Sequence, residues 1–205
     1  MLIFWDQRLV FLATPKAGST AVEMALDPLA AVSMPRPDPL KHMAARDYAA
    51  HLAPYLHSAS GEHFTTVALM RHPLDWLRSW YRFMHRDELD TTQIDSPNQS
   101  FEQFIETCLS DQTHRFAGIG KQTDYLTDEN GGLLIDRLFR YEDMDSLVRF
   151  LEDRLDCAIT LPRVNVPPSV ETKLRPETEI RLREFLADDF RLYGTIGPEH
   201  PPQDS

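Results

Sequence analysis

Residues 8–26, RLVFLATPKAGSTAVEMAL, carry the local pattern from which the fold class follows. The first seven residues of this stretch are a short and almost uninterrupted apolar run, which is typical of a strand buried inside a parallel sheet. Residues 15–18 (PKAG) break this run. Ser19 and Thr20 can then cap a helix that continues to Pro28. The stretch therefore predicts a strand, a tight loop and a helix.

Two further strand–helix units follow along the chain. Residues 64–70 (FTTVALM) are apolar and β-branched, which favours a strand. The tripeptide at 71–73 (RHP) ends this strand, and its proline suits the first turn of the helix LDWLRSWYRFMH. A third strand is expected at 138–141, followed by an amphipathic helix over 144–155.

The remaining segments complete the prediction. Residues 1–14 are expected to form a strand, and a helix is expected over about 43–56. Ser100 followed by Gln103 is a capping-box pattern, which predicts a helix beginning after the serine. A last helix is expected from Pro176 to a stop at Gly194, with an apolar stripe that includes Phe185 and Phe190.

Strands that alternate with helices imply an α/β fold, here a three-layer sandwich with a central, largely parallel sheet covered on both faces. We expect one domain over residues 1–205, with a frayed tail at 197–205. Ligands of such folds bind at the carboxyl ends of the strands. The loops at 15–20 and 71–73 both fall at such ends.

The amino-acid composition and the net charge argue against several classes of protein. Of the 205 residues, 42% are hydrophobic and 26% are charged, which argues against collagen, a coiled coil and wholesale disorder. The net charge of −11 argues against a general nucleic-acid partner, although residues 1–86 carry a net +2 and are the better place for an anion. We find no signal peptide and expect no membrane span, so a cytoplasmic location is expected.

The loop at 15–20 has the residues of an anion site. Gly18 allows the backbone to approach an anion closely, and the helix behind it offers free N–H groups and the positive end of its dipole. Lys16 and two hydroxyls complete the site. It is not a Walker A loop, since Lys16 precedes the glycine instead of following it. An ordinary strand-to-helix turn is the plain alternative.

A second candidate anion site follows the second predicted strand. Arg71 stands at the strand end, and Ser79 lies eight positions on, about two turns (~3.6 residues each) into the helix. A guanidinium fork and a hydroxyl at this spacing can close on one phosphate. In the alternative interpretation, Arg71 pairs with a carboxylate and Ser79 only fills a helix face.

Together the two motifs resemble the sulfotransferase superfamily, most closely its carbohydrate branch of uronyl 2-O- and chondroitin-type enzymes. The resemblance implies a P-loop nucleotide-kinase-like fold and 3′-phosphoadenosine 5′-phosphosulfate (PAPS) as the sulfuryl donor. It also implies that the loop at 15–20 binds the 5′-phosphosulfate and that Arg71 and Ser79 bind the 3′-phosphate. Position 72 is His where Asp or Asn is usual, and Ala17 stands where Thr is common. The loop residues concerned are Pro15, Lys16, Ala17, Gly18, Ser19 and Thr20.

A histidine completes the predicted site. The segment KHMAARDY, residues 41–48, resembles the one in which uronyl 2-O-sulfotransferases place a catalytic histidine, which implies that His42 is the general base. A surface histidine is the alternative. Gln122, Asp124 and Tyr125 resemble a family segment near the acceptor cleft. No metal is expected, because neither HExxH nor a histidine–cysteine set occurs.

The resemblance implies transfer of a sulfuryl group from PAPS to a hydroxyl group, with a saccharide as the expected acceptor. Lys16 would stabilise the charge on the leaving bridge oxygen, and His42 would take the acceptor proton. Two alternatives stay open: a nucleotide or nucleoside kinase of related fold, and a non-catalytic protein that binds adenosine 3′,5′-bisphosphate (PAP). The sequence leaves the oligomeric state open.

Overall fold

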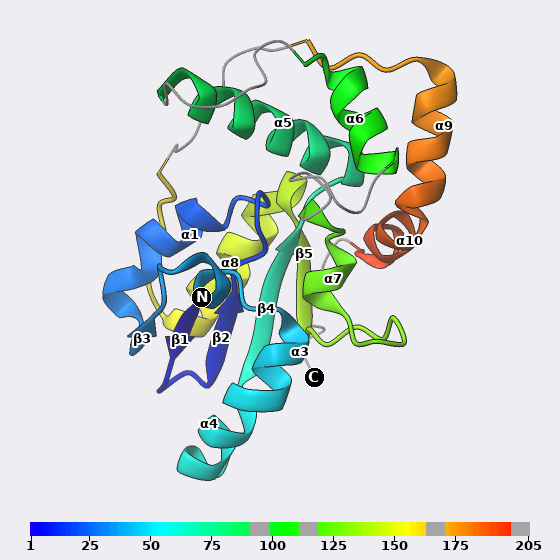
Figure 1. Ribbon diagram of the computed structural model, residues 1–205. Coiled ribbons are helices and arrows are strands. Elements are labelled where there is room, and N and C mark those ends of the chain that lie inside the picture. Colours follow the sequence, from blue (N-terminus) through cyan, green and yellow to red (C-terminus); the bar gives the residue numbers. More distant parts are fainter. Residues whose placement is uncertain (91–98, 111–118, 163–170, 198–205) are drawn as a thin grey trace.

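The computed structural model describes residues 1–90, 99–110, 119–162 and 171–197 (Figure 1). Within these ranges, five strands form one sheet in the order β3-β1-β2-β4-β5. Strands β2, β4 and β5 are parallel, whereas β1 is antiparallel to both of its neighbours. The strands are β1 (Leu2–Phe4), β2 (Leu9–Leu12), β3 (Val32–Ser33), β4 (Thr65–Met70) and β5 (Arg137–Arg140).

The prediction of one strand over residues 1–14 is wrong, since this segment is a hairpin. β1 and β2 pair antiparallel, with Leu2 opposite Phe11, and the turn between them is closed by the Arg8 N–H donating to the Trp5 carbonyl at 3.3 Å. Arg8 adopts a left-handed φ of 51°. The sheet is therefore mixed, and the predicted parallel arrangement holds only for β2, β4 and β5.

The helices surround this sheet (Figure 1). Short 3₁₀ turns occupy Asp27–Leu29 and Tyr141–Asp143, and a π-helical turn occupies Tyr48–Leu52. The α-helices are α1 (Ser19–Leu26), α2 (Asp38–Lys41), α3 (Ala45–Asp47), α4 (Ala53–Ser60), α5 (Pro73–Asp90), α6 (Phe101–Ser110), α7 (Thr123–Leu126), α8 (Met144–Leu155), α9 (Pro176–Phe185) and α10 (Ala187–Thr195).

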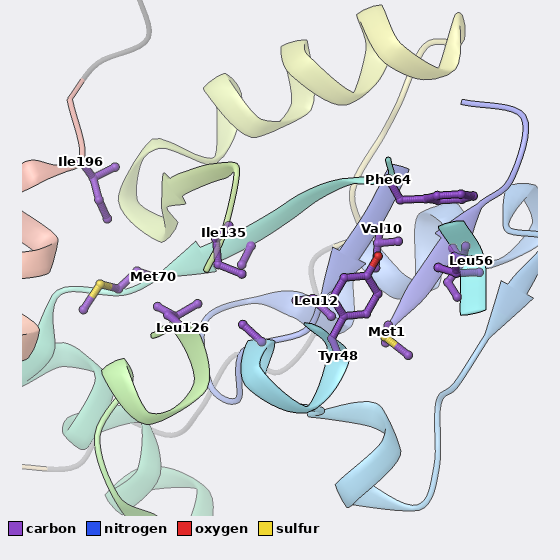
Figure 2. Packing of buried hydrophobic residues seen from close by; sticks show 13 residues of the cluster. Met1, Val10, Leu12, Tyr48, Leu56, Phe64, Met70, Leu126, Ile135 and Ile196 are labelled. Carbon is purple, nitrogen blue, oxygen red and sulfur yellow. The ribbon is translucent and has the colours of Figure 1, made fainter. Parts of the chain in front are cut away.

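Each face of the sheet has its own hydrophobic core. Alternate residues of β2 point to opposite faces: Leu9 and Phe11 pack with α1 and α8, whereas Val10 and Leu12 pack with the α3–α4 segment and α7. Figure 2 shows the second of these clusters, in which Tyr48 and Leu126 lie over the strands. Burial on both faces explains why β2 is an uninterrupted apolar run, as predicted.

A third hydrophobic cluster lies beyond the carboxyl ends of the parallel strands, where α5, α6 and α9 pack together (Figure 1). Trp76 of α5 is fully buried in it. The predicted capping box is confirmed at the start of α6. The Ser100 N–H donates to Gln103 Oε1 at 2.8 Å, and the Gln103 N–H donates to Ser100 Oγ at 3.2 Å.

Two predicted helices differ in detail from those observed. The helix expected over 43–56 is three helical segments that run from Ala45 to Ser60 through the π-helical turn. The helix expected from Pro176 to Gly194 is α9 and α10, which meet at a non-helical Leu186 with ψ of 19°. Phe185, predicted in the apolar stripe, is 40% exposed.

Other predictions concern the ends of elements. The helix predicted over LDWLRSWYRFMH begins at Pro73 and continues to Asp90. Residues 91–98 and the tail from 198 onward lie outside the described residues. The helix predicted over 144–155 is confirmed as α8. Across the described ranges, no helix is both long enough and apolar enough to cross a membrane.

Candidate functional site

A cavity of about 1620 Å³ opens at the carboxyl ends of the parallel strands. The segments that follow β2, β4 and β5 all contribute to its wall, through Lys16, Arg71 and Tyr141 among others. Helix α5 supplies one side, and residues 38–47 supply another. The cavity therefore lies at the edge of the sheet where the sequence predicts ligand binding.

This cavity brings the predicted site residues together. Lys16, Arg71, Ser79 and His42 all line it, although they come from four separate segments of the chain. Ala17 is the exception, because it is fully buried against the core between the sheet and α8. The predicted loop residues that line the cavity are Pro15, Lys16, Gly18, Ser19 and Thr20.

The loop after β2 places a helix start at the cavity. Lys16 and Gly18 have left-handed φ angles of 57° and 83°, which turn the chain sharply into α1. Gly18 is the N-cap residue, and no side chain caps the helix. The predicted capping role of Ser19 and Thr20 is therefore wrong, since Ser19 is already the first helical residue. The first-turn N–H groups and the positive end of the helix dipole can instead bind an anion.

A packed contact joins the two predicted motifs. Gly18 lies so close to Tyr141 that a Cβ atom on it would be 2.7 Å from the tyrosine ring. The Arg71 guanidinium lies 4.4 Å from the centre of the same ring, and its Nη1 donates to the Lys16 carbonyl at 3.4 Å. Tyr141 thus separates Gly18 from Arg71 and sets the spacing between the loops.

Two aromatic side chains of α5 form the wall beside Lys16. Its Nζ lies 3.7 Å from the centre of the Phe83 ring and 5.6 Å from that of Trp80. This cation–π contact holds the ammonium group at the cavity wall. The sequence carried a signal for Phe83, because it lies four residues after Ser79 and therefore on the same helix face. Tyr141 stands at the carboxyl end of the predicted strand at 138–141, but nothing in the sequence indicates its contacts with Gly18 and Arg71.

His42 is held in one tautomer by the backbone. Its Nδ1 lies 2.6 Å from the Ala13 carbonyl oxygen, which can only accept, so Nδ1 carries the proton. Nε2 then keeps its lone pair. Desolvation by burial lowers the pKa of His42 below 6.5, and Lys41 adds to this, outweighing the opposing bond to Ala13. The imidazole is therefore neutral at pH 7 and able to accept a proton.

The other residues singled out in the sequence have different places. Asp124 and Tyr125 line the cavity, whereas Gln122 is fully buried behind it. His72 packs edge-on against Phe190 and Tyr193, at 5.6 and 5.5 Å between ring centres. The unusual histidine between Arg71 and Pro73 thus contacts α10.

The cavity wall carries mixed charge. Among the described residues, no group of three or more His, Cys, Asp or Glu side chains could hold a metal ion. The charged residues that line the cavity are Lys16, Lys41, Arg46, Arg71, Arg82, Asp38, Asp47, Asp124 and Glu142. The cations outnumber the carboxylates and include both predicted anion ligands.

Comparison of the chain with protein-family models, with curated proteins and with solved structures finds no significant match.

Proposed function

We propose that this protein transfers a sulfuryl group from PAPS to a hydroxyl group of a carbohydrate, and that its fold is the P-loop nucleotide-kinase-like fold of sulfotransferases. One observation carries the proposal. A neutral histidine with a free Nε2, His42, lines the same cavity as Lys16 and Arg71. A proton acceptor and two anion ligands in one cavity are what group transfer from an anionic donor requires.

The cavity fits such a donor in size and in chemistry. Its volume of about 1620 Å³ exceeds the ~300–1,000 Å³ of an ordinary small-molecule site, which leaves room for a nucleotide and an acceptor together. Gly18 adopts the left-handed turn that brings the start of α1 to the cavity, and Tyr141 packs where a side chain at this position would lie. Arg71 has a buried Nε that makes no hydrogen bond to any described residue.

Each motif has a role toward the donor. The first-turn N–H groups of α1, with the Ser19 and Thr20 hydroxyls, would bind the 5′-phosphate. Arg71 and Ser79 would bind the 3′-phosphate through a fork and a hydroxyl. Lys16 would then lie beside the bridge oxygen between phosphorus and sulfur.

In the transfer step, the sulfur–oxygen bond to the bridge breaks while a bond from sulfur to the acceptor oxygen forms. The acceptor proton passes to Nε2 of His42, whose Nδ1–H stays bonded to Ala13. Lys16 stabilises the negative charge that develops on the bridge oxygen. No described residue needs to change its protonation state except His42.

A transfer assay tests the proposal. Protein supplied with PAPS labelled in the sulfuryl group should transfer the label to neutral or uronic-acid-containing saccharides. His42→Gln should bind PAP like the wild type and transfer about 10²–10⁴ times more slowly. No transfer to any saccharide, with PAP bound, would favour the non-catalytic alternative. Label transfer from ATP to a nucleoside would favour the kinase alternative.

A further inference from the structure

One buried side chain holds both backbone groups of Arg71. The Arg71 N–H donates to Gln122 Oε1 at 2.8 Å, and Gln122 Nε2 donates to the Arg71 carbonyl at 2.8 Å. Gln122 is fully buried. β4 ends one residue earlier, at Met70, so this amide supplies the pairing that a neighbouring strand would supply. It therefore fixes the peptide planes on either side of the Arg71 Cα.

Gln122 is in turn held by α10. The fully buried carboxyl group of Asp189 accepts the Gln122 N–H at 3.0 Å. It also accepts the N–H and the hydroxyl of Thr123, at 2.9 and 2.8 Å. Asp189 thus accepts hydrogen bonds from N–H groups at the start of α7 that have no partner within the helix. It lies 66 residues after Thr123 in the sequence.

A second, separate connection joins α10 to the residue after Arg71. The His72 N–H donates to Glu142 Oε1 at 2.9 Å, and the Tyr193 hydroxyl donates to Glu142 Oε2 at 2.9 Å. Tyr193 also covers the guanidinium of Arg140 at 4.5 Å, and its carbonyl accepts from Arg140 Nη2 at 3.1 Å. Two connections therefore run from α10 to the turn after β4.

We propose that Gln122 and Asp189 are positioning residues for Arg71, through which α10 sets the affinity of the cavity for a 3′-phosphate. The inference rests on the proposed function, because it takes Arg71 as the phosphate ligand. No residue of α10 lines the cavity, so the helix acts on Arg71 indirectly, through the bonds of Asp189 and Tyr193 and the ring contacts with His72. The Arg71 guanidinium is itself confined by Tyr141 and the Lys16 carbonyl, so a shift of its backbone changes its approach to the anion.

A double-mutant cycle separates positioning from a general loss of stability. Calorimetry would give the Kd for PAP of the wild type, Gln122→Leu, Arg71→Ala and the double variant. Gln122→Leu should raise the Kd about 3- to 10-fold. In the Arg71→Ala background the same change should leave the Kd unaltered. Effects that multiply in the double variant would overturn the inference.

The chain offers a matched control for Asp189. Asp136 accepts the N–H and the hydroxyl of Thr66 at 2.7 and 2.8 Å, the same pair of bonds that Asp189 makes with Thr123. It does so at the opposite end of β4 and does not line the cavity. Asp189→Asn should raise the Kd for PAP, whereas Asp136→Asn should lower only the melting temperature. Equal effects of the two variants on the Kd would overturn the inference.

Hydrogen exchange on the wild type provides a test that needs no variant to fold. Bound PAP should slow amide exchange in α10 as well as in the loop at 15–20, because the helix and the ligand stabilise the same Arg71 conformation. Protection of the loop without protection of α10 would overturn the inference. Wild-type protein that fails to bind PAP refutes the proposed function itself. Binding that Arg71→Ala weakens and Gln122→Leu does not refutes the positioning role alone.

Discussion

Replacing Gly18 with alanine tests the packing between the two anion-binding motifs. Gly18 has a left-handed φ of 83°, and an alanine Cβ would lie 2.7 Å from two carbons of the Tyr141 ring and 3.1 Å from Met144 Cε. Tyr141 must then move, and Arg71 lies on its ring. The substitution should therefore reduce both stability and affinity for PAP.

Gly61 provides the matched control. Its φ is 75°, and nothing lies within 4 Å of the position that a Cβ would take. In both variants, the left-handed conformation of the alanine lowers the free energy of unfolding by about 1–2 kcal/mol. Only Gly18→Ala adds the overpacking, typically about 1–3 kcal/mol. At roughly 2–4 °C per kcal/mol for a chain of this size, Gly61→Ala should lower Tm by roughly 2–8 °C and Gly18→Ala by roughly 4–20 °C.

Scanning calorimetry gives the two melting temperatures, and titration calorimetry gives the Kd for PAP. Gly61→Ala should bind PAP like the wild type, and Gly18→Ala should bind it much more weakly. Two results would refute the reasoning. One is a Gly18→Ala protein no less stable than Gly61→Ala. The other is a destabilised Gly18→Ala protein with an unaltered Kd, which would mean that Tyr141 does not connect the loop to Arg71.

Three further predictions concern protonation and capping. The transfer rate should be constant above about pH 7, because His42 is then neutral. It should fall as the pH decreases through the pKa of His42, which lies below 6.5, because a protonated imidazole accepts no proton. A profile that stays flat to pH 5 would contradict the role of His42. Desolvation raises the pKa of Glu102, but hydrogen bonds from Thr178 and Arg175 outweigh it, so the pKa lies below 4.5. Ionised Glu102 therefore stabilises the folded state. Its contribution is complete above pH 4.5 and is lost as the pH falls through the folded-state pKa. In urea titrations, Glu102→Gln should therefore flatten the acid limb of stability, and an unchanged limb would count against these bonds. Ser100→Ala should cost about 1 kcal/mol of unfolding free energy and leave the Kd for PAP unchanged, and loss of binding would show that the capping box reaches the site.

Local patterns predicted most of the elements but not the turns that contain neither glycine nor proline. The hairpin between β1 and β2 was missed because its turn, Trp5 to Arg8, contains neither glycine nor proline. Its left-handed residue is Arg8, which packs over the Trp5 and Phe64 rings at 5.3 and 5.6 Å. Tertiary contacts thus stabilise a conformation that arginine rarely adopts. The break at Leu186 was missed for a similar reason, since Leu182 and Leu186 both keep a helical spacing.

Part of the candidate site could also be predicted from local patterns, and part of it could not. The two loops could be predicted because a glycine, a proline and a basic residue at a strand end form a local pattern. The contacts that Tyr141, Gln122 and Asp189 make there could not, because only the folded chain brings these residues to Arg71. No spacing rule relates residues that lie 51 or more positions apart, so their connection to the loops appears only in the tertiary structure.

The binding of PAP to the unmodified chain is the direct test of the cavity. At 100 times its Kd, PAP should raise the unfolding free energy by about 2.7 kcal/mol, and hence Tm by roughly 5–11 °C. Arg71→Ala should reduce this shift more than Lys16→Ala, because PAP lacks the sulfuryl group beside Lys16. The absence of any shift with millimolar PAP on folded protein would contradict PAPS as the donor. A shift with magnesium-ATP alone would point to the kinase alternative.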